Sequence, residues 1–125
     1  MDDIDRRLSR LAGQPFRDRF HLRGADLATA RRPGPFVLRQ HALDLITERL
    51  APAAPRKDGK QTPYRGHPVC VAQHATATCC RTCLQRWHDI PKGRALTGDE
   101  RSYVVEVIDR WIIGEVAAEQ PPTAG

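Results

Sequence analysis

Aromatic residues are scarce in this chain, which holds three Phe, two Tyr and two Trp among 125 residues. No apolar run approaches the roughly 18 residues that a membrane span requires, and residues 1–11 are charged, unlike a secretion signal. These absences argue against a membrane protein and favour one small domain with a modest core, which we expect to be cytoplasmic. In that reducing compartment, four cysteines are more typical of a metal site or of reactive thiols than of disulfides.

Acidic residues are nearly missing from the middle of the chain. Residues 51–96 hold two Asp/Glu and eight Lys/Arg, whereas residues 97–125 hold six Asp/Glu and two Lys/Arg. A basic segment of this kind suits nucleic acid or another anionic partner, although a merely solvated basic surface has the same composition. The candidate phosphate contacts are Lys60, Arg65, Arg81, Lys92 and Arg94.

Apolar residues recur at helical spacing in several segments, so the sequence predicts a mainly α domain of about four to five helices. The clearest early pattern is Leu38, Ala42, Leu45, Ile46 and Leu50. The predicted helices cover residues 3–11, 25–30, 35–50, 78–88 and the segment that follows Thr97.

The last of these helices has the strongest start signal. Thr97 and Glu100 have the spacing of a capping box, in which each side chain bonds the other residue's amide. Gly114 is placed to end this helix, and little after it can be buried. We therefore predict a single domain over residues 1–114 and a disordered tail over residues 115–125.

Seven possible metal ligands fall in one short stretch of the basic segment. They are His67, Cys70, His74, Cys79, Cys80, Cys83 and His88. Zinc in proteins is bound tetrahedrally by Cys and His side chains, so this composition predicts a zinc site.

Predicted local structure narrows the ligand set. The segment 69–74 is short and contains β-branched residues, which favours an extended backbone. In such a backbone Cys70 and His74 lie about 13 Å apart, so they cannot bind the same metal ion. In a helix from about residue 78, Cys83 converges with Cys79 or Cys80, while His88 points about 140° away from Cys83. The predicted ligands are therefore His74, Cys80 and Cys83, with Cys79 or a water in the fourth position.

Other readings of the same residues stay open. Thiols at a helix N-terminus are activated by the local positive field, and Cys80 and Cys83 form a C-x-x-C, so thiol or redox chemistry is one alternative. An iron–sulfur centre and buried structural cysteines are two more. His67 and His88 are candidate catalytic acids or bases, and either could replace Cys79 as the fourth ligand.

The long central motif resembles a known family. Gln73-His74-Ala75-Thr76-Ala77-Thr78-Cys79-Cys80-Arg81, together with Pro15-Phe16-Arg17, Arg65-Gly66-His67-Pro68 and Trp111, is similar to the bacterial family catalogued as domain of unknown function 4186. The resemblance covers nearly the whole ordered chain. It implies a stand-alone domain of this length and brings no established activity.

Three functions are compatible with these patterns. The first is a zinc-binding helical module whose basic segment binds nucleic acid. The second is a small metal- or thiol-dependent enzyme that uses the Cys/His residues. The third is a protein-interaction module in which the metal only stabilises the fold.

Overall fold

A computed structural model describes residues 2–118, in which all regular secondary structure is helical. The mainly α prediction is confirmed, but the described part of the chain forms seven helices instead of four to five. They are α1 (Asp3–Ala12), α2 (Pro15–Asp18), α3 (Gly24–Arg31), α4 (Pro35–Arg49), α5 (Pro68–Ala75), α6 (Arg81–His88) and α7 (Gly98–Ala118). Within these residues, no helix combines the length and the apolarity that crossing a membrane would take.

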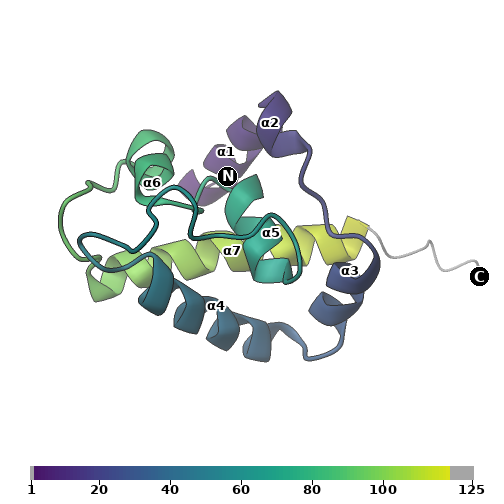
Figure 1. Ribbon diagram of the computed structural model, residues 1–125. Coiled ribbons are helices and arrows are strands. Elements are labelled where there is room, and N and C mark those ends of the chain that lie inside the picture. Colours follow the sequence, from purple (N-terminus) through teal and green to yellow (C-terminus); the bar gives the residue numbers. More distant parts are fainter. Residues whose placement is uncertain (1, 119–125) are drawn as a thin grey trace, which may run out of the picture.

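The long helix α7 is the axis of the molecule, and α4 lies along it (Figure 1). Helices α1, α3 and α5 also contact α7. The predicted apolar face of α4 is confirmed, since Ile46 and Leu50 are fully buried against a core that includes Val104 and Ile108 of α7. This α4–α7 pair forms the main apolar core.

The start of α7 is a capping box, as predicted. The Glu100 amide donates to Thr97 Oγ1 at 3.1 Å, and the Thr97 amide donates to a Glu100 carboxylate oxygen at 2.9 Å. The predicted end at Gly114 is wrong, because α7 continues to Ala118, where Val116 packs against the core. Residues 115–118 are thus helical, and the remainder of the predicted disordered tail lies outside the described residues.

The extended segment predicted over residues 69–74 is also wrong, because these residues lie in α5. Every residue of α5 is buried, so tertiary packing overrides the weak strand preference of its β-branched side chains. His67 caps this helix by accepting the Val69 amide at 3.0 Å. The following helix begins at Arg81 and not near Thr78, because Ala77 has a left-handed backbone (φ 58°) that turns the chain between α5 and α6.

Candidate metal centre

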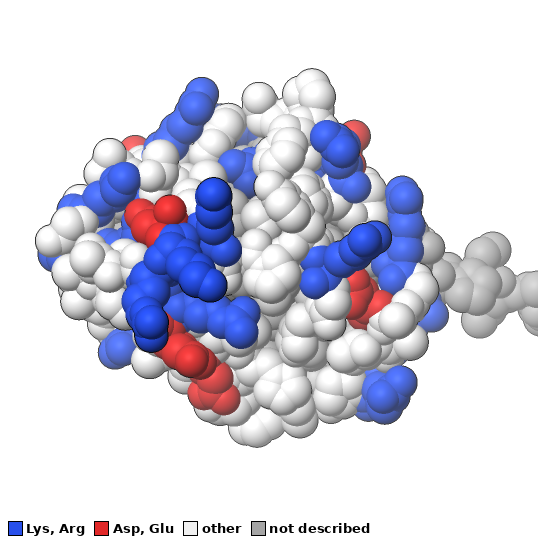
Figure 2. All heavy atoms as spheres, viewed as in Figure 1, with Lys and Arg blue, Asp and Glu red and all other residues white. Residues whose placement is uncertain are grey.

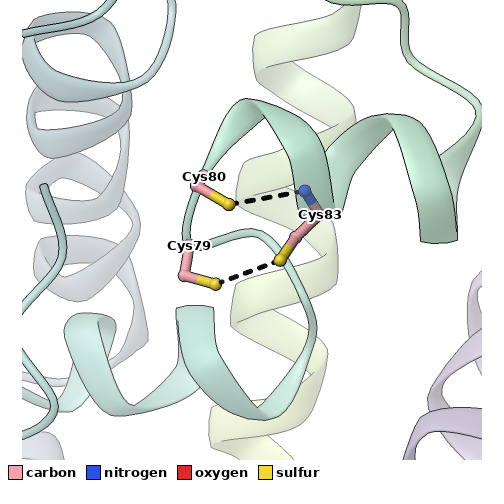
Figure 3. Close-up of side chains that lie close together, drawn as sticks. All are labelled: Cys79, Cys80 and Cys83. Carbon is pink, nitrogen blue, oxygen red and sulfur yellow. Dashed lines mark hydrogen bonds between the residues drawn. The ribbon is translucent and has the colours of Figure 1, made fainter. Parts of the chain in front are cut away.

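Cys79, Cys80 and Cys83 bring their three sulfur atoms within 4.8 Å of one another, and we call this group the cysteine site (Figure 3). The sulfurs of Cys79 and Cys83 are 3.7 Å apart. This is far from the roughly 2.05 Å of a disulfide, but it matches the roughly 3.8 Å that separates two sulfurs bound tetrahedrally to one zinc at about 2.3 Å each. The structure therefore brings together three of the four predicted metal ligands.

The first turn of α6 holds the cysteine site in place. Cys80 is the N-cap of α6, and its sulfur accepts the Cys83 amide at 3.4 Å. Asp58, from the connection between α4 and α5, accepts the Arg81 amide at 3.2 Å. These amides mark the positive end of the helix, which favours negative charge nearby.

Arg17 of α2 is the residue at this site that the sequence did not indicate. Its guanidinium donates to Cys83 Sγ at 3.2 Å, to Cys79 Sγ at 3.7 Å and to the His74 carbonyl oxygen at 2.7 Å. Arginine belongs to no metal-ligand pattern, and α2 lies about sixty residues away in the chain. The only signal was the unusual mixture of arginine and aromatic residues after Pro15.

The thiols of Cys79 and Cys83 differ in acidity. Hydrogen bonds from Cys79 and Cys80, followed by the Arg17 guanidinium, lower the pKa of Cys83. Hydrogen bonding with Cys80 and Cys83, together with burial, raises the pKa of Cys79. Of these two thiols Cys83 is therefore the more acidic, and it is also the most accessible residue of the cysteine site.

His74, the fourth predicted ligand, lies beside the cysteine site but is not a member of the group. Its Nε2 donates to the Thr62 carbonyl oxygen at 2.9 Å. Its ring stacks on Tyr64, with centroids 4.4 Å apart, and on Phe20, at 5.2 Å. Burial lowers the pKa of the His74 imidazole, which keeps the ring neutral, as a metal ligand must be.

The two histidines predicted as catalytic groups lie away from the sulfurs. His88 is buried in the core, where Nε2 donates to the Thr76 carbonyl at 2.7 Å and Nδ1 accepts from the Tyr103 hydroxyl at 2.8 Å. His67 is the N-cap of α5, and its ring meets that of His41 at 5.6 Å. Both ring nitrogens of His88 therefore have structural partners, and neither histidine is a member of the cysteine site.

Of the five predicted phosphate contacts, three donate hydrogen bonds to other groups of the protein, and two are exposed without an ion pair in the described part of the chain. Arg81 is only 1% exposed, and its guanidinium donates to backbone carbonyls, so it does not fit a surface role. Arg94 forms a bidentate ion pair with Glu100, at 2.7 Å for both bonds. Lys92 donates to the Thr82 hydroxyl at 2.8 Å. Within residues 2–118, Lys60 and Arg65 are exposed and form no ion pair.

The family predicted from the central motif is confirmed. The family model described as a domain of unknown function (DUF4186) matches residues 5–113, so the chain belongs to that family. No solved structure matches the chain.

Proposed function

We propose that this family member is a zinc-binding module in which Cys79, Cys80 and Cys83 bind the ion as thiolates. The observation that carries the proposal is the spacing of the sulfurs, all within 4.8 Å and two of them at the 3.7 Å expected of neighbouring ligands. Three soft ligands at the start of α6 also favour zinc over harder cations.

Charge balance supports the same assignment. Three thiolates and one Zn²⁺ leave a net charge of −1, and burying an uncompensated charge is costly. Arg17 supplies the opposite charge at 3.2 Å from Cys83 Sγ. A zinc–thiolate site with this guanidinium is therefore close to neutral, which suits the buried positions of Cys79 and Cys80.

We further propose that His74 is the fourth ligand. Its own carbonyl shares the Arg17 guanidinium with the sulfurs of Cys79 and Cys83. The Nε2 bond to the Thr62 carbonyl is the kind of outer hydrogen bond that orients a ligating histidine. With Nε2 bonded to Thr62, Nδ1 would be the ligating atom, and His74 would have to move toward the sulfurs, because it is not a member of the cysteine site.

Bound zinc would act here as a structural centre that ties the start of α6 to the connection between α4 and α5. Thr62 Oγ1 donates to the Cys79 carbonyl at 2.8 Å, and Asp58 holds the first amide of α6. Fixing the cysteines therefore also fixes the connection between α4 and α5, which has no regular secondary structure of its own. Such a connection gains the most from a metal because its ordering has a large entropy cost.

The primary test is the zinc content of the purified protein, with a titration of its free thiols. We expect one zinc per chain and no readily titrated thiol in the folded protein, because Cys70 is buried and the other three thiols are bound; unfolding in the presence of a chelator should expose all four thiols. Cys79→Ala, Cys80→Ala and Cys83→Ala should each lower zinc affinity steeply. Cys70→Ala is the matched control, since Cys70 is buried outside the cysteine site and should leave the zinc content unchanged.

The role of His74 needs its own test. Cobalt substituted for zinc reports its ligands in the visible spectrum, where a site of three sulfurs and one nitrogen differs from one of three sulfurs and water. His74→Ala should shift this spectrum and weaken binding, whereas His41→Ala should do neither. An unchanged spectrum would assign the fourth position to solvent, which is the arrangement of catalytic zinc sites.

A second candidate function is thiol chemistry at Cys83. The observation that favours it is that the most accessible sulfur of the three is also the one closest to the Arg17 guanidinium. Protein that is purified without metal and is alkylated by iodoacetamide first at Cys83 would favour this function over zinc binding. Arg17→Gln should then slow the alkylation.

A further inference from the structure

Four rings from separate parts of the chain meet beside the cysteine site, and we call them the ring surface: Phe16, Phe20, Tyr64 and His74. Phe16 meets Phe20 edge to face, with centroids 5.3 Å apart. Phe20 and Tyr64 are nearly parallel at 6.0 Å, and Tyr64 stacks on His74 at 4.4 Å. Three of the seven aromatic residues of the chain are gathered in this one place.

Two rings of this surface are open to solvent. Tyr64 is 63% exposed, although its ring stacks on the buried His74, and Phe16 is 44% exposed. Tyr64 belongs to the connection between α4 and α5, which crosses in front of α5 in Figure 1. A contiguous group of exposed rings is a common sign of a binding surface, whereas a single exposed ring is not.

Cations accompany the exposed rings. The Arg17 guanidinium lies 5.0 Å from the centre of the Phe16 ring. Arg19, Lys60 and Arg65 are exposed in the segments that carry the rings. Figure 2 shows an uncharged band running down the middle of one face, with Lys and Arg side chains gathered on both sides of it.

The nearby carboxylates are already engaged. Asp26 accepts the Gly66 amide at 3.4 Å, and Asp18 lies 3.8 Å from His21. The segments that carry the rings are basic by count, because residues 15–23 hold three Arg against one Asp and residues 56–67 hold four Lys/Arg against one Asp, which complements a polyanion.

We infer that the ring surface binds a single-stranded nucleic acid, with unpaired bases stacked on Tyr64 and Phe16 and phosphates held by Arg65 and Lys60. Exposed rings interleaved with cations are the common device of proteins that bind single strands without reading their sequence. A duplex keeps its bases stacked inside the double helix, so it could contact only the charged side chains of this surface. The inference shares one element with the proposed zinc site, since zinc would fix His74 beneath Tyr64.

The test is fluorescence anisotropy with labelled oligothymidine and oligouridine of about twelve nucleotides, a length within the usual site size for single strands. Tyr64→Ala should weaken binding about tenfold or more, as the loss of one stacking ring does elsewhere. Phe36→Ala is the matched control, because Phe36 is 82% exposed on α4 and should have no effect. Tyr64→Phe should bind like the parent.

Salt dependence separates the phosphate contacts from the stacking. Arg65→Ala and Lys60→Ala should each reduce the slope of log affinity against log salt by about 1, while Tyr64→Ala should leave the slope unchanged. Equal binding of single strands and duplex that is insensitive to Tyr64→Ala would overturn the inference and leave only a charged surface. So would the absence of any binding.

Zinc content measured on every variant keeps the two proposals apart. Tyr64→Ala should retain the zinc of the parent protein, so a loss of binding in it reports on the ring surface alone. Strong single-strand binding by a protein that holds no zinc would refute the metal proposal and leave the ring surface supported.

Discussion

The α4–α7 pair and the region around the cysteine site bury their atoms in different ways. Between α4 and α7 the buried side chains are aliphatic, such as Ile46 against a core that includes Ile108, and the ion pairs of Arg39 lie at the rim. Stability there follows from apolar area and close packing, which are not directional.

Around the cysteine site many buried groups are polar and have specific hydrogen-bond partners, although Arg81 Nε has none among the described residues. Gln73 donates to the Thr78 carbonyl at 3.0 Å, the hydroxyls of Thr76 and Thr78 are 3.0 Å apart, and Thr62 bonds the Cys79 carbonyl. Such a network is rigid when complete and costly when one partner is lost. The two regions should therefore respond differently to substitution, to metal removal and to pH.

The largest expected effect is that of Arg81→Met. The Arg81 guanidinium donates to the carbonyls of Pro52, Pro91 and Arg94 at 2.8–2.9 Å, so it joins the connection after α4 to the loop after α6. Its loss leaves several buried acceptors unpaired, and we expect the free energy of unfolding to fall by about 4 kcal/mol in urea denaturation. Arg10→Met, at an exposed position, is the control and should change stability little. A loss below about 1 kcal/mol would mean that water replaces the guanidinium.

Ile46→Ala tests the apolar region in the same way. Ile46 is fully buried, and the cavity left behind should lower the free energy of unfolding by about 3 kcal/mol. Because no polar partner is involved, the loss should be the same with and without a zinc chelator. A loss that depends on the chelator would show that the two regions are coupled more tightly than their contacts indicate.

The difference between the regions explains what the sequence could predict. The helices α4 and α7 follow from the period of their apolar residues, and the capping box at Thr97 and Glu100 is a four-residue pattern. The three cysteines are equally local, since they fall within five positions. Local patterns of this kind were sufficient to predict the mainly α fold and the three cysteines that could hold a metal ion.

The contacts that sequence reasoning missed are distant ones. Arg17 donates to a sulfur that lies more than sixty residues further along the chain. Arg81 is buried because backbone carbonyls from two loops surround it. Nothing in the sequence around either arginine distinguishes it from an arginine that is exposed to solvent. Helix α5 was misread for a related reason, because its Val and Cys residues are buried by neighbours on all sides and local preference does not decide their conformation.

Removal of zinc should distinguish the α4–α7 pair from the region around the cysteine site most directly. If zinc is held at about one hundred times its dissociation constant, a chelator should lower the free energy of unfolding by about 2.7 kcal/mol. Amide hydrogen exchange should then quicken in the first turn of α6 and around Thr62, while α4 and α7 keep their protection. Cys70→Ala protein should respond like the parent. An even loss of protection across all helices would contradict the view that the metal stabilises one region.

The smallest expected effect lies at the start of α7, away from the cysteines. The Arg94 guanidinium, followed by the Thr97 amide, lowers the pKa of the Glu100 carboxyl to about 2. Since this pKa is below that of the unfolded chain, the stabilisation is complete above about pH 4.3 and is lost as the pH falls from there through about 2. Glu100→Gln should therefore cost about 1 kcal/mol at neutral pH, and this difference should shrink on acidification. Urea denaturation at a series of pH values measures this difference in the free energy of unfolding, with Asp99→Asn as the control. A difference that stays constant down to about pH 2 would mean that the shape of the Glu100 side chain, and not its charge, stabilises the protein.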